Sequence, residues 1–400
     1  MSRLLDKLGV AVPHILLPES DEGKWGCIAC DQYTSQREVW DELDKTVGNA
    51  PSTLRLVLPE CDLDKSDVYI PRIHNIMKEY LENVLTRQVD SFVLTARKTQ
   101  SGVRKGLMLC IDLEQYDYSR GSVSRVRATE GTILSRIPPR RKVREGAPLE
   151  TPHVMLLIND SEKKLIEPLY EKYIAKTPLY NVELLRDFGR LTGWKIEKED
   201  ESAIEDALKT LDEKHGNAPL FAVGDGNHSL ASAKSAWERK KATLPENEWE
   251  DHPMRYALCE VVNLYDDALL FAPIHRVLTN VDADELKAAL QKATTAKSGN
   301  VVLVTKDGQA ALCGLPIEVL QPALDEYLKG HPDTSIDYVH GDDTARTLGR
   351  QRNACSLLLP TPDKSHFFES IAEGPLPRKA FSMGQANEKR CYYECRKITR

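Results

Sequence analysis

The sequence has no long hydrophobic run and no excess of positive charge. None of its apolar stretches approaches the roughly 20 residues that a membrane-spanning helix needs, so we expect no membrane partner. Its 54 lysines and arginines against 61 aspartates and glutamates give a formal net charge of -7. Such a balance lacks the basic footprint of a nucleic-acid-binding protein. The N-terminus also lacks the apolar core of a signal peptide, and we therefore expect a cytoplasmic protein.

The sequence contains cysteines, but their spacing does not indicate a disulfide framework. The nine cysteines are scattered along a long chain, which favours reduced thiols over disulfides. Cys27 and Cys30 form one close pair and Cys391 and Cys395 another, but the distance between the pairs favours buried thiols over a zinc site. The sequence also has no P-loop and no kinase glycine-rich loop, so an ordinary nucleotide-kinase fold is not expected.

The composition is that of a globular protein with more than one lobe. Four hundred residues, 41% of them hydrophobic and 29% charged, exceed what one small core needs. The mixture of helix and strand patterns predicts an α+β fold. We expect an N-terminal part and catalytic core over 1–280, an accessory α+β lobe over 281–330, and a C-terminal segment over 331–400 that returns to the active site. The oligomeric state is expected to be a monomer or a small homo-oligomer.

The most informative stretch is FAVGDGNHSLASAK, residues 221–234. An apolar run typical of a buried strand is broken by a glycine turn, and apolar residues then recur at helical spacing. The start of a helix favours an anion, because its backbone N–H groups and dipole point there. Two interpretations are open. The turn is an ordinary one with Asn227 as helix cap, or it is a phosphate site that uses Asp225 and His228, which the density of polar residues favours.

Two other stretches carry polar residues of the same kind. In ACDQYTSQREVWDEL, Asp31 stands at the mouth of a predicted helix, where it is either a capping residue or a base for a substrate hydroxyl. Residues 125–144 hold six arginines and one lysine. They form either a solvated face or a site for phosphate oxygens, which the guanidinium fork binds bidentately. We expect Pro138 and Pro139 to prevent a continuous helix there.

The apolar pattern of the remaining sequence predicts the other strands and helices of the fold. We expect strands over 12–17, 54–58, 91–97, 105–113, 152–158, 254–262, 336–341 and 356–359, and helices over 67–84, 159–173 and 203–211. The lobe is predicted as a helix over 284–292, strands over 300–305 and 309–313, and a helix over 317–329. The segment Pro273–Arg276 is interpreted as a short polar insertion.

The strand–GDGNH turn–helix motif resembles the DGHHR-type motif of ParB/sulfiredoxin-like proteins. In that superfamily the motif holds phosphates. The segments ACDQYTSQ, RATEGT, IPPRRKVRE, PIHR, IDYVHG and GPLPRKAFSMG also resemble a family of unknown function that includes pyrophosphate-dependent L-serine kinases, and together they span nearly the whole chain. This chain departs from the motif at Ser229, where DGHHR-type motifs end in arginine, and Asp31 stands where a nucleotide-dependent relative has glutamate.

The resemblance implies a ParB/sulfiredoxin-like core and phosphoryl transfer from pyrophosphate to the hydroxyl of L-serine. It implies Asp31 as general base, and Asp225 and His228 as catalytic residues, with Asp225 also holding Mg²⁺. Phosphate binding is expected at Gly226, Asn227, Ser229, Arg127, Thr129, Glu130, Arg140, Arg141, Arg144 and Lys379. Substrate binding is expected at Gln32, Tyr33, Ser35, His275, Arg276 and His340.

Three rival functions were weighed against this one. The same fold could use ATP or ADP, which would need an adenine slot that the sequence does not reveal. A phosphate- or nucleotide-gated binding module is the alternative of another class, and the acidic charge argues against a DNA partner for it. Sulfiredoxin-like reduction needs a cysteine in the turn, and residues 224–229 contain none.

Overall fold

The structure, a computed structural model, describes residues 4–5, 8–20, 23–34, 36–295, 299–377 and 379–400. The chain divides into two compact units. Unit 1 comprises Met1–Leu269, Ile371–Gly374 and Gln385–Arg400, and unit 2 comprises Leu270–Ser370 and Pro375–Gly384. The second unit therefore begins before the expected boundary at residue 281 and extends well beyond residue 330.

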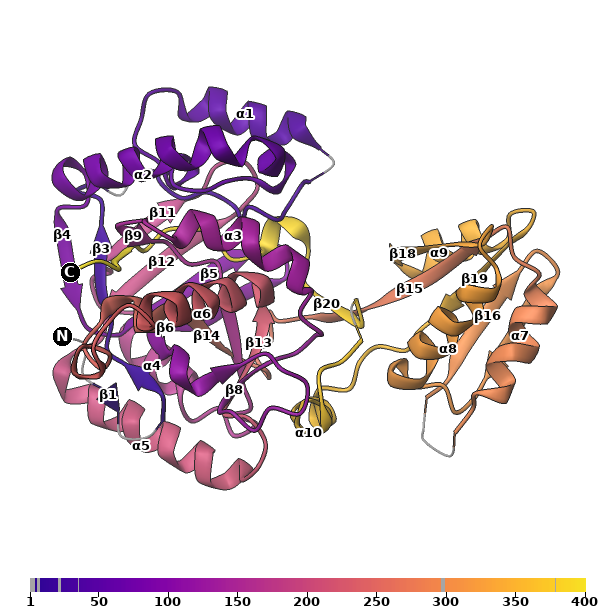
Figure 1. The fold of residues 1–400 in the computed structure, drawn as a ribbon. Helices are drawn as coiled ribbons and strands as arrows, with labels where there is room; N and C mark the ends of the chain where they lie inside the picture. Colours follow the sequence, from indigo (N-terminus) through magenta and orange to yellow (C-terminus); the bar gives the residue numbers. More distant parts are fainter. Residues whose placement is uncertain (1–3, 6–7, 21–22, 35, 296–298, 378) are drawn as a thin grey trace. The chain divides into compact units, whose positions relative to one another are not determined.

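Unit 1 is built on a mixed sheet, which has 11 strands in the described residues and runs in the order β11-β12-β5-β6-β14-β10-β13-β8-β7, with β2 beside β6 and β1 beside β2 (Figure 1). The strands are β1 (Leu4–Leu5), β2 (Val10–Ala11), β5 (Val93–Thr99), β6 (Gly102–Asp112), β7 (Tyr116–Asp117), β8 (Val126–Ala128), β10 (Met155–Ile158), β11 (Tyr180–Glu183), β12 (Arg190–Lys195), β13 (Phe221–Asp225) and β14 (Tyr256–Asn263). In addition, β3 (His14–Leu17) pairs with β4 (Arg87–Asp90), and β9 (Leu149–Glu150) pairs with β21 (Arg396–Lys397). Next to β13, β10 runs antiparallel and β8 runs parallel.

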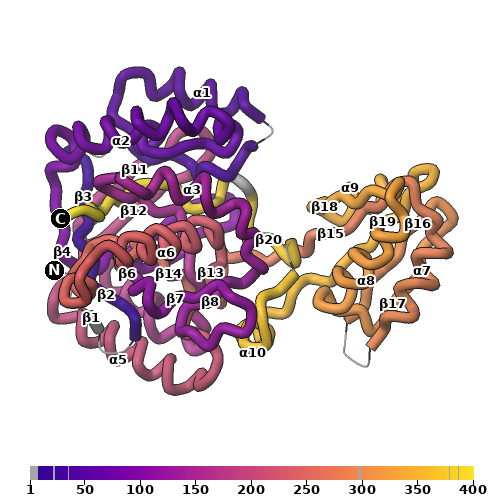
Figure 2. Tube along the Cα trace, in the orientation of Figure 1, coloured from indigo at the N-terminus to yellow at the C-terminus, as the bar shows by residue number. Residues whose placement is uncertain are grey.

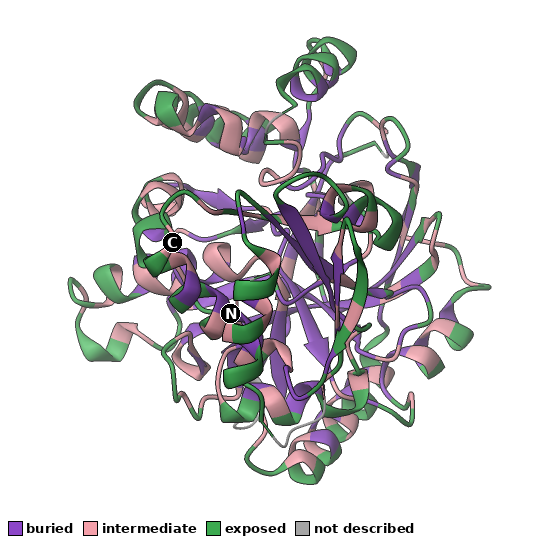
Figure 3. Cartoon of the chain, turned by 90° about the vertical axis from the view of Figure 1, so that its right-hand side faces the viewer, coloured by how far each residue is buried: buried purple, intermediate pink, exposed green. Residues whose placement is uncertain are grey.

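Helices flank this sheet. They are α1 (Arg37–Val47), α2 (Ser66–Asn83), α3 (Ile137–Arg144), α4 (Ile166–Tyr173), α5 (Lys198–His215) and α6 (Asn227–Lys241). Helix α6 buries Leu230, Ala233 and Trp237, the apolar spacing that predicts it. Helices α3 and α6 lie side by side (Figure 1). In Figure 3 the strands are largely buried and the exposed residues lie mainly on helices and loops.

The C-terminal segment from residue 385 is part of unit 1. Cys395 forms a bridge with Leu16 of β3, and Figure 2 shows this end of the chain, in yellow, beside β3. Arg390, only 2% exposed, pairs with Glu260 of β14 at 3.0 Å between Nη1 and Oε2. Because an unpaired buried charge is costly, this ion pair holds the segment against the sheet.

Unit 2 is a smaller α+β unit around a sheet in the order β17-β16-β19-β15-β18, with β20 beside β15. Its strands are β15 (Phe271–Thr279), β16 (Val301–Thr305), β17 (Gly308–Leu312), β18 (Ser335–His340), β19 (Ala354–Leu358) and β20 (Phe381–Met383). Its helices are α7 (Ala283–Lys292), α8 (Ile317–Gly330) and α9 (Asp342–Gly349), and α10 (Phe367–Glu373) spans the division between the units. The predicted helices and strands of the 281–330 lobe are confirmed.

Two local predictions, those for residues 54–58 and 273–276, are wrong. Residues 54–58 form no strand: Ser52 caps a 3₁₀ turn at Thr53–Arg55 by accepting from the Leu54 N–H at 3.2 Å. As expected, residues 125–144 form no continuous helix: β8 and a 3₁₀ turn come first, and α3 begins only at Ile137, with the two prolines in its first turn, where a missing N–H costs nothing. The segment Pro273–Arg276 is part of strand β15 and not an insertion.

The fold class and the central motif agree with the prediction. The α+β class is confirmed, and so is the strand–turn–helix at residues 221–241. All nine cysteines are described, and all are free thiols. Within the described residues, none of the helices combines the length and the apolar character that crossing a membrane would take.

Candidate active site

The turn between β13 and α6 brings backbone N–H groups and polar side chains together. Gly226 adopts the left-handed conformation, with φ 83° and ψ 27°, which glycine adopts without a steric cost. A Cβ at this position would lie 3.1 Å from both Cα and Cγ2 of Val154. Gly226, not Asn227, is the N-cap residue, and no side chain of the described residues caps the helix. The first N–H groups of α6 therefore remain available to an acceptor.

Asp225 and Asn227 flank this glycine with unused acceptors. Asp225 Oδ1 accepts the Gly226 N–H at 3.0 Å. Its Oδ2 is buried and accepts no hydrogen bond within the described residues, and the same is true of Asn227 Oδ1. Asn227 Nδ2 donates to Thr129 Oγ1 at 3.3 Å, and that hydroxyl in turn donates to the Val223 carbonyl at 2.7 Å. Thr129 thus fixes the turn, while two oxygens stay open.

The structure brings Asp31 to this turn from the distant N-terminal segment. The Asp31 side chain accepts a hydrogen bond from the Gln32 amide at 2.9 Å. Burial alone raises the pKa of Asp31, but His153, Gln32 and Lys389 act against it and the net pKa is lowered. Asp31 is therefore an ionised carboxylate at neutral pH. The same Lys389 pairs with the turn, where its Nζ lies 3.3 Å from Asp225 Oδ2.

His228 is neutral and has a defined tautomer. Its Nε2 accepts the Ile133 N–H at 3.2 Å, so the ring proton is on Nδ1. Burial, followed by the charges of Arg140 and Arg136, lowers the pKa of His228 to about 4. At neutral pH this histidine offers an N–H donor rather than a positive charge.

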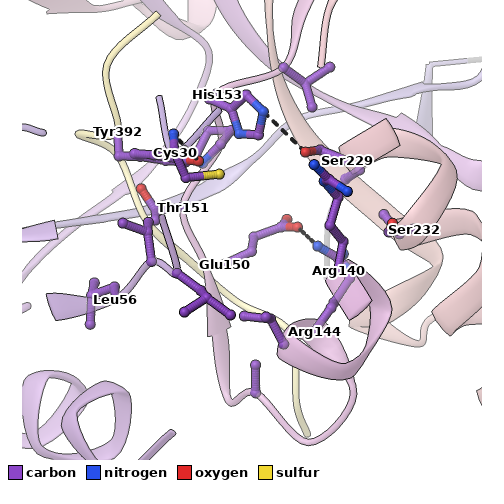
Figure 4. Close-up of a pocket in the computed structure, with 18 of the residues that line it drawn as sticks. Cys30, Leu56, Arg140, Arg144, Glu150, Thr151, His153, Ser229, Ser232 and Tyr392 are labelled. Atoms are coloured by element: carbon purple, nitrogen blue, oxygen red, sulfur yellow. Dashed lines mark hydrogen bonds and ion pairs between the residues drawn. The ribbon is translucent and has the colours of Figure 1, made fainter. Parts of the chain in front are cut away.

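A cavity of about 160 Å³ adjoins these groups (Figure 4). Ser229 and His153 meet at its rim, with 3.0 Å between Oγ and Nε2, and Cys30, Arg140 and Tyr392 line the same end. Apolar side chains line much of the rest: Leu56, Val57, Leu58, Leu63, Met77, Val143, Ala147, Leu149, Leu230 and Ala257. Burial, followed by the Asp31 charge, raises the pKa of Cys30 to about 12, so its thiol is not a nucleophile at neutral pH.

Most of the arginines predicted to bind phosphate are engaged by the protein itself. Arg127 donates to the carbonyls of Ser124 and Asn217, both at 2.8 Å. Arg140 pairs with Glu60, and Arg144 with Glu150.

Arg141 contacts Glu145 at 3.0 Å and donates to Ser235 Oγ at 3.2 Å. Arg140 and Arg144 both line the cavity, whereas Arg127 supports the loop before β13. Glu130 follows β8 and is half-buried.

The other predicted residues of the Asp31 segment are placed as follows. Gln32 holds the Asp31 carboxylate. Tyr33 has a positive φ of 52°, and its carbonyl accepts the Gln36 N–H at 3.0 Å. Ser35 lies outside the described residues.

Four predicted site residues belong to unit 2. His275 and Arg276, on β15, have no exposed surface. Ile274 pairs with His340 of β18. Arg276 Nη1 donates to the Lys379 carbonyl at 3.0 Å, and the Lys379 Nζ lies 4.5 Å from the ring centre of Tyr338. These residues form a cluster of their own within unit 2.

Two residues near Asp31 were not predicted from the sequence. His153 lies two residues before the buried strand β10 and inside the strand predicted over 152–158, so a histidine within an apolar run was the available signal. Lys389 carried no such signal, because the segment around it has neither a motif nor a period. Only the return of the C-terminal segment to unit 1 places it here.

The fold and this site define an α+β protein with a polar turn between a buried strand and helix α6. The chain belongs to the family described as "Protein of unknown function (DUF1015)", whose model matches residues 13–327. No curated protein matches the chain.

Solved structures show a limited similarity. SbnI with a C-terminal truncation, from Staphylococcus aureus, has a TM-score of 0.36 at 8% identity, covering 72% of this chain and 85% of its own. A free serine kinase in complex with AMP has a TM-score of 0.38 at 11% identity, with 73% and 92% covered. A conserved hypothetical protein from Pyrococcus furiosus has a TM-score of 0.33 at 11% identity, with 69% and 90% covered. Family membership is the firm result, and the family's description assigns its members no reaction.

Proposed function

We propose that this protein is a phosphotransferase that moves a phosphoryl group from inorganic pyrophosphate to the hydroxyl of L-serine, giving O-phospho-L-serine and phosphate in the cytoplasm. The observation that carries the proposal is the ion pair of Lys389 with Asp225 at the start of α6, together with a second carboxylate, Asp31, whose pKa the Lys389 charge helps to lower. The likeness of the turn to the DGHHR-type motif of ParB/sulfiredoxin-like proteins and of the other quoted segments to pyrophosphate-dependent serine kinases supports the choice of reaction.

Each group has a chemical task in this reaction. The ionised Asp31 accepts the proton of the serine hydroxyl as that oxygen attacks phosphorus. The N–H groups of α6 and the Nδ1–H of His228 donate to the oxygens of the phosphoryl group as charge develops on them. Because the attacking oxygen and the phosphorus must be aligned, most of the rate gain comes from positioning and charge stabilisation. The proton ends on Asp31, and the second phosphate leaves.

A magnesium ion fits the chemistry of Asp225. Its Oδ2 is buried without a hydrogen bond, and a carboxylate oxygen is a ligand that Mg²⁺ prefers. Within the described part of the chain no group of three histidine, cysteine, aspartate or glutamate side chains could hold a metal. Asp225 would therefore hold the ion together with phosphate oxygens and water, as is usual for Mg²⁺ at phosphate sites. When bound, the ion would neutralise charge on the phosphates.

The cavity beside the turn favours a second candidate donor, a nucleotide. Its wall includes Leu56, Leu58, Met77 and other apolar side chains, while Arg140 and Ser229 lie at the polar end. Pyrophosphate has no apolar part that such a wall could bind, whereas the adenine ring of a nucleotide would be buried there. In addition, Arg140 and Arg144 already pair with glutamates. With an ADP or ATP donor, L-serine would remain the acceptor and Asp31 the general base.

The test is phosphoserine formation, read by mass spectrometry. Purified protein is incubated with L-serine and Mg²⁺ and, in separate reactions, pyrophosphate, ADP or ATP. Phosphoserine from pyrophosphate supports the proposal, and phosphoserine only from a nucleotide supports the second donor. No phosphoserine from any donor overturns the kinase and favours a phosphate-binding protein.

A matched pair of variants tests whether Asp31 is the general base. Asp31→Asn should lower the turnover number about 100- to 10,000-fold, the usual contribution of a general base. Glu38→Gln removes an exposed carboxylate in the first turn of α1 and should leave the rate unchanged. An Asp31→Asn protein with a near-normal rate would show that another group takes the proton.

A further inference from the structure

Within the described residues, Lys389 is the cation that pairs with Asp225. Its Nζ is 3.3 Å from Asp225 Oδ2, and the lysine side chain is 18% exposed. That oxygen accepts no hydrogen bond within the described residues. Lys389 and Asp225 therefore form an ion pair without a hydrogen bond between them. An ammonium group has three donors, and in the described chain Asp225 is the group that Lys389 contacts.

The residues on both sides of Lys389 hold its backbone in place. Glu388 accepts from both the N–H and the hydroxyl of Ser101, each at 2.9 Å, and its carbonyl accepts from Arg104 at 2.7 Å. On the other side, Arg390 forms the buried ion pair with Glu260 at 3.0 Å. A lysine between two buried and paired neighbours is presented to the turn by the fold, unlike a lysine on a mobile surface loop.

The arginines around the cavity are less available for a ligand. Arg140 and Arg144, which line it, each pair with a glutamate that is not part of the turn. The partner of Lys389 is instead Asp225, a residue of the turn itself, and Lys389 also acts on the Asp31 carboxylate and helps to lower its pKa. Two carboxylates and a phosphate repel one another, so the site needs positive charge, and Lys389 would supply it from the protein in addition to the Mg²⁺ proposed at Asp225.

We propose that Lys389 is a phosphate-binding residue of this site, whose ammonium is held by Asp225 before the donor arrives and is then shared with the donor's phosphate oxygens. The inference rests on the proposed function for its ligand and goes beyond it by assigning the cation. Without the ligand, the ion pair keeps the lysine side chain close to the turn. With the ligand, the free donors of the ammonium form charge-assisted hydrogen bonds to phosphate.

The test compares three variants of the full-length protein in two measurements. Calorimetry measures pyrophosphate binding in the absence of serine, and steady-state kinetics measures kcat and KM for the donor. Lys389→Met should weaken pyrophosphate binding about 10- to 100-fold, the value of one hydrogen bond to a charged group, and raise KM accordingly. Lys389→Arg should recover most of the affinity, because it keeps a positive donor. Lys397→Met, an exposed lysine of β21, should change neither.

The outcomes separate this inference from the proposed function. Wild-type affinity in the Lys389→Met protein overturns the inference, and so does a loss that Lys389→Arg fails to reverse while the melting temperature falls, which is the mark of a structural lysine. A wild-type protein that binds no pyrophosphate also overturns it. If binding depends on Lys389 but no phosphoserine forms, the inference stands and the proposed function fails.

Discussion

Two histidines, one in each unit, show how differently this chain uses buried polar groups. His275 of unit 2 has both ring nitrogens engaged, with Nε2 donating to Asp342 at 3.0 Å and Nδ1 accepting the Leu359 N–H at 3.1 Å. His228 of unit 1 uses only Nε2 within the described residues, as acceptor of the Ile133 N–H. Both were expected to serve in one active site.

The difference separates a structural group from one that is available to a ligand. A buried polar atom without a partner costs free energy, so a fold retains it only where something else is gained. Around Gly226 the open atoms include Asp225 Oδ2 and Asn227 Oδ1. On β15, Arg276 is tied to Gln321 at 3.0 Å and to two backbone carbonyls. The first region keeps two acceptors open to a ligand, whereas both ring nitrogens of His275 and three hydrogen bonds of Arg276 are used within unit 2.

The largest effect is expected from replacing these two histidines in turn. His228→Ala should lower the rate of phosphoserine formation about 100-fold, because it removes an N–H donor to the developing charge, with a small change in melting temperature. His275→Ala should retain most activity but lower the free energy of unfolding by about 1–3 kcal/mol, since it leaves a buried backbone N–H unpaired. Rate assays and chemical denaturation of both variants measure the contrast. Loss of activity at normal stability in His275→Ala would instead place a substrate contact in unit 2.

A second comparison, between Gly226 and Gly121, tests why the turn needs a glycine. Gly226 and Gly121 both have a φ of 83°, but an added Cβ has no atom within 4 Å at Gly121 and lies 3.1 Å from Val154 at Gly226. Gly121→Ala should therefore cost about 1 kcal/mol for the backbone conformation alone. Gly226→Ala should cost about 1 kcal/mol more for crowding and also reduce activity. Equal costs, measured by denaturation, would mean that Val154 moves aside freely.

The smallest expected effect is on the pH dependence of stability, and it should have the same direction for His228 and His275. Burial is the first cause that lowers the pKa of each. Their unfolded pKa is about 6.5, so below pH 6.5 the unfolded chain takes up protons that the folded chain does not, and stability falls as the pH falls. For His228 this loss continues down to its folded pKa of about 4. His228→Asn and His275→Asn should each make the decline of the melting temperature between pH 6.5 and 4.5 shallower.

Because burial also lowers the pKa of His252, part of the decline should remain in both variants. An unchanged slope in His228→Asn would mean that His228 is already protonated in the folded protein near pH 6. The ring would then be a cation at this turn, and its Nε2 would not accept the Ile133 N–H.

Local patterns predicted most of the framework. Apolar periodicity located the turn between β13 and α6, the hairpin of β5 and β6, and all four elements over 284–329. The errors have different causes. Apolar residues at 54–58 are buried without strand pairing beside a capped turn. The predicted boundary at residue 281 missed β15 because its pairing partners, β18 and β19, lie far along the chain.

By itself the sequence determined the α+β class and the turn with Asp225, Gly226 and His228, because a strand, a glycine turn and a helix are set by short-range periodicity and backbone sterics. The tertiary structure alone decided which charges meet there. Asp31 and Lys389 come from opposite ends of the chain, and the arginines of 125–144 find glutamates and carbonyls that no local pattern indicates. Electrostatic contacts act over a few ångströms in space regardless of separation along the chain, so only the folded chain shows which charges are paired and which remain for a ligand.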